Sequence, residues 1–342
     1  MSPTPETPEP SRSKSHPRVA LAKWLKPDPY ALVLVTVVAT ASVLPCRGNV
    51  AVGFEWLTKF AIFLLFYMHG AKLSREAILG GIGAWKLHGL VLSSTFLLFP
   101  ALGVSVSMLP DDWISPTIKM GFLFLTILPS TVQSSIAFTS MARGNVAAAV
   151  CTASLSNMLG VFITPLLAGL LMRSELQSSG GDMLGVMRSI ILTLLMPFLI
   201  GHLSRPLIGK WIDRHKALLS KLDRGAILLV VYTAFSAAVV DGIWQRVSAS
   251  DIVAILAVSA VVLTVVLMLT RKTAQLIGLS KGDEITLVMC GSKKSLASGV
   301  PMAAAMFAPA QVGVIILPLM IFHQLQLIVC AIIARNYGDR AT

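Results

Sequence analysis

Apolar runs long enough to cross a membrane follow one another along most of the chain. A helix needs about 20 apolar residues to cross the hydrocarbon core of a bilayer. The pattern predicts ten spans, at residues 30–45, 53–69, 83–109, 118–141, 147–171, 184–203, 225–243, 252–270, 285–307 and 312–334. We therefore expect an all-α polytopic membrane protein with ten transmembrane helices.

Two of these runs are interrupted by short polar stretches. In the fourth run residues 129–135 read PSTVQSS, and in the ninth run residues 290–301 read CGSKKSLASGVP. Where a helix breaks within hydrocarbon, its unpaired backbone groups are costly unless they line a polar cavity. Interruptions at corresponding places in two halves of a chain indicate a binding site near the bilayer midplane.

The second interruption contains Lys293 and Lys294, which makes it the most unusual stretch of the sequence. A cation at the bilayer centre costs at least about 2.5–3.5 kcal/mol on insertion scales, so it needs water, a partner or neutralisation. We interpret the pair as part of a functional site. The alternative is that the ninth span begins later and both lysines lie at the cytoplasmic interface.

Composition agrees with a membrane protein, because 55% of the 342 residues are hydrophobic and only 13% are charged. The net charge of +12 is not gathered in one aromatic-rich patch, which argues against a nucleic acid partner. Apart from Lys293 and Lys294, twenty basic residues lie on the same side of the membrane as the N-terminus, and six lie on the opposite side. This excess predicts that both termini are cytoplasmic. The four cysteines have no CxxC spacing, which argues against a zinc site.

The chain divides into four predicted parts. Residues 1–26 are rich in proline and serine and are expected to form a disordered cytoplasmic tail, not a signal peptide. Residues 27–203 hold the first five-helix repeat, and residues 204–224 are predicted to be a basic cytoplasmic linker. Residues 225–342 hold the remainder of the second repeat and a short C-terminal tail, and the sixth helix (184–203) belongs to that repeat. Because five is an odd number, the repeats must be inverted relative to one another.

Polar side chains of the interruptions and of the fifth span make up the candidate substrate and ion site. They are Lys294, Lys293, Ser292, Ser295, Gln133, Ser134, Ser135, Ser130, Thr131 and Asn157. The hydroxyl groups are either ligands or only partners for the backbone of the broken helices. An amide in hydrocarbon needs partners, which slightly favours a functional role for Gln133.

Several motifs resemble the bile acid/sodium symporter superfamily. FYMHGAKL at 66–73 and ARGNV at 142–146 are similar to the superfamily as a whole. WKLH at 85–88 and KSLASGVPM at 294–302 are similar to its divergent branch, which includes bacterial proteins and vertebrate and fungal relatives linked to calcium regulation. The resemblance implies two inverted repeats, with spans 1, 2, 6 and 7 forming a panel and the other six a core in which the two broken helices cross.

The resemblance also assigns positions that differ from those of sodium-coupled members. Met289 stands where those members have an acidic sodium ligand, and Lys293 and Thr95 stand where they have glutamines. We therefore expect a lysine ammonium, first of all that of Lys294, in the place of the sodium ion, since lysine is a compact monovalent cation. A tethered cation cannot be co-transported, so neither a conventional sodium site nor any other cofactor or metal is expected. Coupling to protons stays possible, because a buried amine can release its proton.

The resemblance implies a secondary transporter that moves an organic, anionic and amphipathic solute by alternating access. The alternative is a non-transporting membrane regulator or receptor linked to calcium homeostasis. The sequence contains no HExxH motif or other catalytic set, so we do not expect an enzyme. The expected partners are a small-molecule solute and the lipid bilayer, in a bacterial inner membrane, and both monomer and homodimer stay open.

Overall fold

The computed structural model describes residues 29–72, 84–172, 188 and 191–339. These residues are mostly helical and contain no strand. The helices are α2 (Pro29–Val43), α3 (Gly48–Lys72), α5 (Trp85–Ser93), η2 (Ser94–Leu98), α6 (Phe99–Ser107), α7 (Pro116–Ile127), α8 (Gln133–Met141), α9 (Val146–Leu171), η3 (Ile191–Leu195), α12 (Met196–Arg214), α13 (Lys216–Val240), α14 (Ile243–Arg246), α15 (Ala249–Ile277), α16 (Lys281–Gly291), α17 (Leu296–Met306) and α18 (Pro309–Asp339). The predicted tail at residues 1–26 and the predicted start of the sixth span lie outside the described residues.

Seven continuous helical segments within the described residues are long and apolar enough to cross a membrane. They are α3, α5 to α6 joined through η2, α9, η3 with α12, α13, α15 and α18. The other predicted spans are formed by shorter helices: α2, the pair α7 and α8, and the pair α16 and α17. The structure thus breaks the fourth and ninth predicted spans at the interruptions seen in the sequence.

Local sequence explains both breaks. Leu128 leaves the helical conformation (φ −73°, ψ 156°) because it precedes Pro129, and a residue before proline is disfavoured in a helix. After the second break, α17 begins at Leu296 and is capped by Ser295, whose side chain accepts a hydrogen bond from the Ser298 N–H. The turn at residues 142–146 is anchored to the second half, because the Asn145 side chain caps α9 and also donates to Asp283 at the start of α16.

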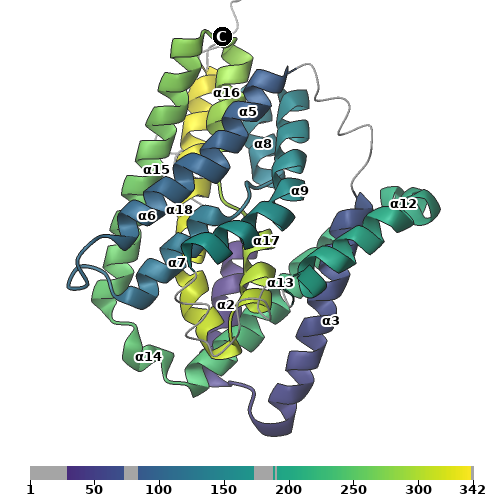
Figure 1. The fold of residues 1–342 in the computed structure, drawn as a ribbon, viewed down its shortest axis with the longest axis vertical. Coiled ribbons are helices and arrows are strands. Elements are labelled where there is room, and N and C mark those ends of the chain that lie inside the picture. The colour runs from purple at the N-terminus through teal and green to yellow at the C-terminus, as the bar shows by residue number, and fades with distance from the viewer. Residues whose placement is uncertain (1–28, 73–83, 173–187, 189–190, 340–342) are drawn as a thin grey trace, which may run out of the picture.

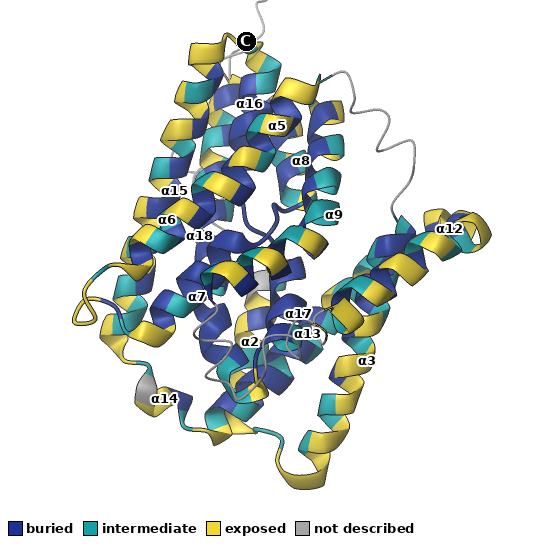
Figure 2. Ribbon diagram, in the orientation of Figure 1, coloured by how far each residue is buried: buried dark blue, intermediate teal, exposed yellow. Residues whose placement is uncertain are grey.

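Two groups of helices lie next to one another (Figure 1). The panel group consists of α2, α3, α12 and α13, in which α3 packs against α12 and α13, and α2 packs against α13. The core group consists of α5 to α9, including η2, and α15 to α18. It contacts the panel group mainly through α17 and α18 on α13. Figure 2 shows exposed residues along much of α3 and α12, and these include apolar side chains such as Trp56, Phe60, Leu203 and Leu207. Exposed apolar helices of this kind suit contact with lipid.

The backbones of α3 and α12 approach each other at two glycines. A Cβ atom on Gly70 would lie 1.9 Å from the Phe198 carbonyl oxygen, and one on Gly201 would lie 1.9 Å from the Tyr67 carbonyl oxygen. Such small residues let membrane helices pack closely. The two glycines therefore fix the packing of the panel group.

Residues 204–224, predicted to be a linker, are helical apart from the junction at His215. They extend α12 and begin α13. Ile212 and Leu219 in this stretch are buried and pack in one cluster with Met68 and Ala71 of α3. This stretch has an apolar helical face, but its many basic residues dominate the sequence pattern. For this reason the pattern alone indicates a loop.

Candidate ion and solute site

The two helix breaks contact one another directly. The Ser295 N–H donates to the Pro129 carbonyl oxygen (2.9 Å), and the Ser130 hydroxyl donates to the Cys290 carbonyl oxygen (2.6 Å). Backbone groups released by one break are thus satisfied by the other. The structure brings the two interruptions of the sequence together in one place, which we call the crossing (residues 128–132 and 292–295).

Lys294 lies at the centre of the crossing and is fully buried. Its Nζ atom donates to three carbonyl oxygens, those of Thr95 (2.8 Å), Thr126 (2.7 Å) and Leu128 (2.6 Å). A lysine ammonium has three N–H donors, so each of them has an acceptor. Nζ also lies 4.3 Å from the centre of the Phe99 ring, whose π face attracts a cation.

The end of α7 supplies two of these carbonyl groups. The last four carbonyl groups of a helix have no partner within it. Here the Leu128 N–H bonds the Leu125 oxygen, the Thr164 hydroxyl bonds the Ile127 oxygen, and Lys294 bonds Thr126 and Leu128. The negative end of the helix dipole favours a cation at this position.

The third carbonyl group is available because of the π-helical turn η2. The Phe99 N–H bonds the Ser94 oxygen, five residues earlier. In this register the Thr95 oxygen faces Pro100, which has no N–H to donate. The Lys294 ammonium donates to the Thr95 oxygen instead. The predicted site residue Thr95 therefore contributes its carbonyl oxygen, whereas its hydroxyl donates to Val91 within the same helix.

A glutamine of α18 holds the backbone of Lys294. The Gln326 amide accepts from the Lys294 N–H and donates to the Lys294 carbonyl oxygen, both at 2.9 Å. Gln326 is fully buried, as two hydrogen bonds to the backbone require. Gln326 was not among the predicted site residues, although an amide inside an apolar span was a signal for it.

Lys293 is also fully buried, with its Nζ donating to the Ser134 carbonyl oxygen (3.1 Å) and lying 4.2 Å from the Phe138 ring centre. The alternative that both lysines lie at an aqueous interface is therefore wrong. Helix α16, which leads to the lysines, begins at Lys281, twelve residues before Lys293, and packs against α5, α8 and α15.

The predicted hydroxyl groups lie around the crossing but face different partners. Ser292 donates to the Val288 oxygen of its own helix, and Ser295 caps α17. Thr131 lies within hydrogen-bonding distance of the Ser134 and Ser135 hydroxyls (2.7 and 3.0 Å). Ser292 and Ser295 thus bond backbone groups beside the second break, whereas Thr131, Ser134 and Ser135 contact one another.

Asn157 of α9 connects both breaks. Its amide nitrogen donates to the Ser130 oxygen and its amide oxygen accepts from the Ser298 hydroxyl, each at 2.7 Å. Gln133, the first residue of α8, is exposed. Both side chains border the space described next.

Two adjoining cavities of about 210 and 250 Å³ lie between the panel group and the core group. We call them together the cleft. Residues of the crossing and its neighbours line the core side, and residues of α3 and α13 line the panel side. Both cavities are lined by His69, Val132, Gln133, Asn157, Asp223 and Ser298. Lys293, Lys294 and Thr95 do not line the cleft; they lie behind its core wall.

The panel side of the cleft carries ionisable residues that were not among the predicted site residues. Lys72 pairs with one Asp223 oxygen at 2.5 Å, and His69 and Arg224 lie nearby in the lining. The other Asp223 oxygen, Oδ1, is buried and accepts no hydrogen bond from the residues that the structure describes. A signal existed in the sequence, because His69 and Lys72 lie one helical turn apart at the end of an apolar run.

No group of three histidine, cysteine or acidic side chains suited to a metal ion occurs in the described parts of the chain. The arrangement instead offers a fixed internal cation behind a cleft with polar and charged walls. An arrangement of this kind can bind a solute between the two groups of helices.

Comparison with known proteins places the chain in a family. The SBF-like CPA transporter family matches residues 28–339. The Escherichia coli (strain K12) protein named "Putative symporter YfeH" is 54% identical over 310 residues, which cover 91% of this chain and 92% of that protein. Sodium/bile acid cotransporter 7 of Xenopus tropicalis is 25% identical over 321 residues, covering 92% of this chain and 93% of that protein. The predicted resemblance is confirmed: the chain is an integral membrane protein that belongs to the SBF-like CPA transporter family, within the bile acid/sodium symporter superfamily.

Proposed function

We propose that this protein is a secondary transporter that moves an organic anion by alternating access, without a conventional sodium site. The observation that carries the proposal is the position of Lys294. Its ammonium is held by three carbonyl oxygens at the crossing, as a small monovalent cation would be held. A sodium ion has no role in this arrangement, because the charge is already present and tethered.

The solute class follows from the walls of the cleft. Lys72 and Arg224 outnumber the single carboxylate of Asp223, which suits an anionic group. Leu65, Phe66, Val161, Phe198, Ile227 and Met302 supply apolar surface, which suits an amphipathic molecule. The free Asp223 oxygen can accept a hydrogen bond from a solute hydroxyl. The Xenopus relative has bile acid in its name, and a bile acid is such a molecule.

We further propose that the chain forms ten spans in two inverted repeats. The paired breaks, α7 to α8 and α16 to α17, support this arrangement, as does the separation into panel and core groups. Transport would then consist of movement of the core group against the panel group around the cleft. The excess of basic residues on one side and the similarity to an E. coli protein support an inner-membrane location with cytoplasmic termini.

Uptake into proteoliposomes tests the proposal. We expect saturable uptake of taurocholate or a steroid sulfate by the purified protein, at the same rate with sodium or choline as the external cation. Protein-free liposomes provide the background.

A strict sodium requirement would contradict the role proposed for Lys294. Specific binding of the anion without uptake would instead favour a non-transporting receptor. Loss of binding in Lys72→Gln, with protein folding retained, would support the cleft as the solute site.

A further inference from the structure

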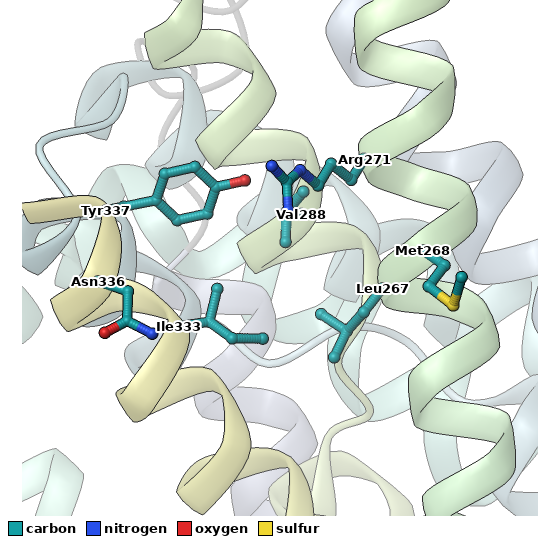
Figure 3. Close-up of a pocket in the computed structure, with 7 residues that line it drawn as sticks. All are labelled: Leu267, Met268, Arg271, Val288, Ile333, Asn336 and Tyr337. Atoms are coloured by element: carbon teal, nitrogen blue, oxygen red, sulfur yellow. The ribbon is translucent and has the colours of Figure 1, made fainter. Parts of the chain in front are cut away.

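A second hollow, distinct from the cleft, lies in the core group. It is a groove of about 260 Å³ between α15, α16 and α18. Its lining, shown in Figure 3, consists of Leu267, Met268, Arg271, Val288, Ile333, Asn336 and Tyr337. The groove therefore combines an apolar floor with a polar end.

The polar and apolar parts of the groove lie at different depths along the helices. Arg271 directly follows the apolar run of α15, and Asn336 and Tyr337 occupy the last turn of α18. Figure 3 shows Arg271 and Tyr337 pointing toward one another, with Ile333 and Leu267 farther along the groove. Tyrosine and arginine are typical of the headgroup level of a bilayer, and the aliphatic residues match the depth of acyl chains.

The charged residues at the polar end of the groove leave the Arg271 guanidinium accessible to a ligand. Glu284 is nearly buried and is already bonded by Lys281 (2.8 Å) and the Tyr337 hydroxyl (2.9 Å). Arg271 is farther from that carboxylate, with Nε at 4.0 Å, and half of its side chain is exposed. Its planar guanidinium can bind two phosphate oxygens at once.

The surroundings favour a negatively charged occupant. Lys272 and Lys281 are exposed near Arg271, so these three basic residues still outnumber Asp283 and Glu284 at the start of α16. The pair of Arg335 and Asp339 adds no net charge. Basic pockets between transmembrane helices bind anionic lipid headgroups. An anion joined to an apolar chain would match both ends of the groove.

We propose that this groove binds one anionic phospholipid of the surrounding leaflet. Arg271 and the Asn336 amide hold its phosphate, and one acyl chain lies against Leu267, Val288 and Ile333. Val288 belongs to α16, which ends at the crossing, so the lipid packs on the half-helix that leads to the lysine pair. The site is independent of the cleft and of any transported solute.

Photolabelling with lipids tests the proposal on the full chain. The purified protein is incubated with a phosphatidylglycerol that carries a diazirine on its acyl chain, in competition with unlabelled phosphatidylglycerol or phosphatidylcholine. We expect labelling of peptides from α15 and α18 that phosphatidylglycerol suppresses and phosphatidylcholine does not. This measurement needs no variant, so it remains decisive even if a substitution impairs folding.

Two matched variants locate the headgroup site. Arg271→Gln should weaken the competition by phosphatidylglycerol about fivefold, the effect of one basic residue near an anionic lipid. Arg214→Gln removes an exposed arginine at the end of α12, which does not line the groove, and should leave the competition at the wild-type level. Equal competition by both lipids, labelling spread over all helices, or the same effect from both variants would overturn the proposal.

Discussion

The ammonium of Lys294 is stabilised without any carboxylate among its contacts. Three backbone carbonyl groups and one aromatic ring surround it, so its charge is balanced by dipoles and a ring quadrupole. Each carbonyl group would cost about 1–3 kcal/mol if it were left buried without a donor. Lys294 therefore joins η2, α7 and the second break through hydrogen bonds that no aliphatic residue could replace.

Lys294→Ala should create a sodium site. The three carbonyl groups lose their donors, and we expect the midpoint of thermal unfolding to fall by about 5–10 °C in choline buffer. Sodium should restore part of the loss, because the vacated space is lined by carbonyl oxygens. Thermal unfolding of the purified variant in choline and in sodium buffer measures this difference.

Lys293→Ala is the control, since its Nζ contacts a single carbonyl group. We expect a smaller decrease and no recovery with sodium. If the two variants responded equally to sodium, the Lys294 ammonium would not stand in the place of a sodium ion.

At the scale of single residues, the sequence predicts which residues are in contact, but it does not always predict which of their atoms make the contact. Lys294 and Thr95 are adjacent as expected, yet the contact uses the Thr95 backbone. That result depends on the π-helical turn and on Pro100, and hydrophobic periodicity does not reveal a shift of one hydrogen-bond register. Gln326 was missed for a related reason, because its partner is the backbone of a distant segment.

Helix breaks and close helix packing decide the arrangement of elements. The sequence predicts both breaks, because Pro129 and the polar run at 292–295 interrupt apolar segments. It does not predict the helical extension through residues 204–224, where charge dominates the pattern and the buried face is narrow. The glycine contacts between α3 and α12 also depend on which two helices pack, which the sequence alone leaves open.

Gly201→Ala should disrupt the panel group. The added methyl group would overlap the Tyr67 carbonyl oxygen, a backbone atom that can move only if the whole helix moves. We expect a loss of roughly 1–3 kcal/mol in stability, the usual cost of overpacking. The unfolding midpoint in mild detergent measures it.

Gly89→Ala serves as the matched substitution, because a Cβ atom at Gly89 of α5 meets nothing within 4 Å. Alanine is also the better helix former, so this variant should be as stable as the wild type or slightly more stable. A similar loss in both variants would mean that the contact between α3 and α12 is not the cause.

On the scale of the whole molecule, the cleft brings together helices that are far apart in the chain. His69 and Asp223 meet in it although more than 150 residues separate them. The sequence places the core wall of the cleft, because polar residues interrupt apolar spans there. The sequence does not predict the panel side of the cleft. Its charged residues look like ordinary loop residues in the sequence, and only the fold brings them together.

Gln133→Cys should report movement around the cleft. In a background where Cys46 and Cys151 are replaced by serine, a membrane-impermeant maleimide should label this cysteine from one side of a vesicle. Taurocholate should slow the labelling, because Gln133 lines the cleft in which we propose that the anion binds. Labelling rates in inside-out and right-side-out vesicles provide the measurement.

Ser250→Cys is the reference position, since Ser250 is exposed at the start of α15 and lies outside the cleft. Its labelling should not respond to taurocholate. If Gln133→Cys reacted equally from both sides, or was insensitive to the anion, the cleft would not be an alternating pathway.

The tethered cation at the crossing has an electrical consequence. If the core group carries Lys294 across part of the membrane field, the loaded carrier moves an anion together with a fixed positive charge, and the two nearly cancel. The empty carrier returns with the positive charge alone, in a membrane potential worth about 2.3 kcal/mol per charge and 100 mV. Such a protein would exchange one anion for another more readily than it accumulates anions, and the membrane potential would set the direction in which its empty form rests.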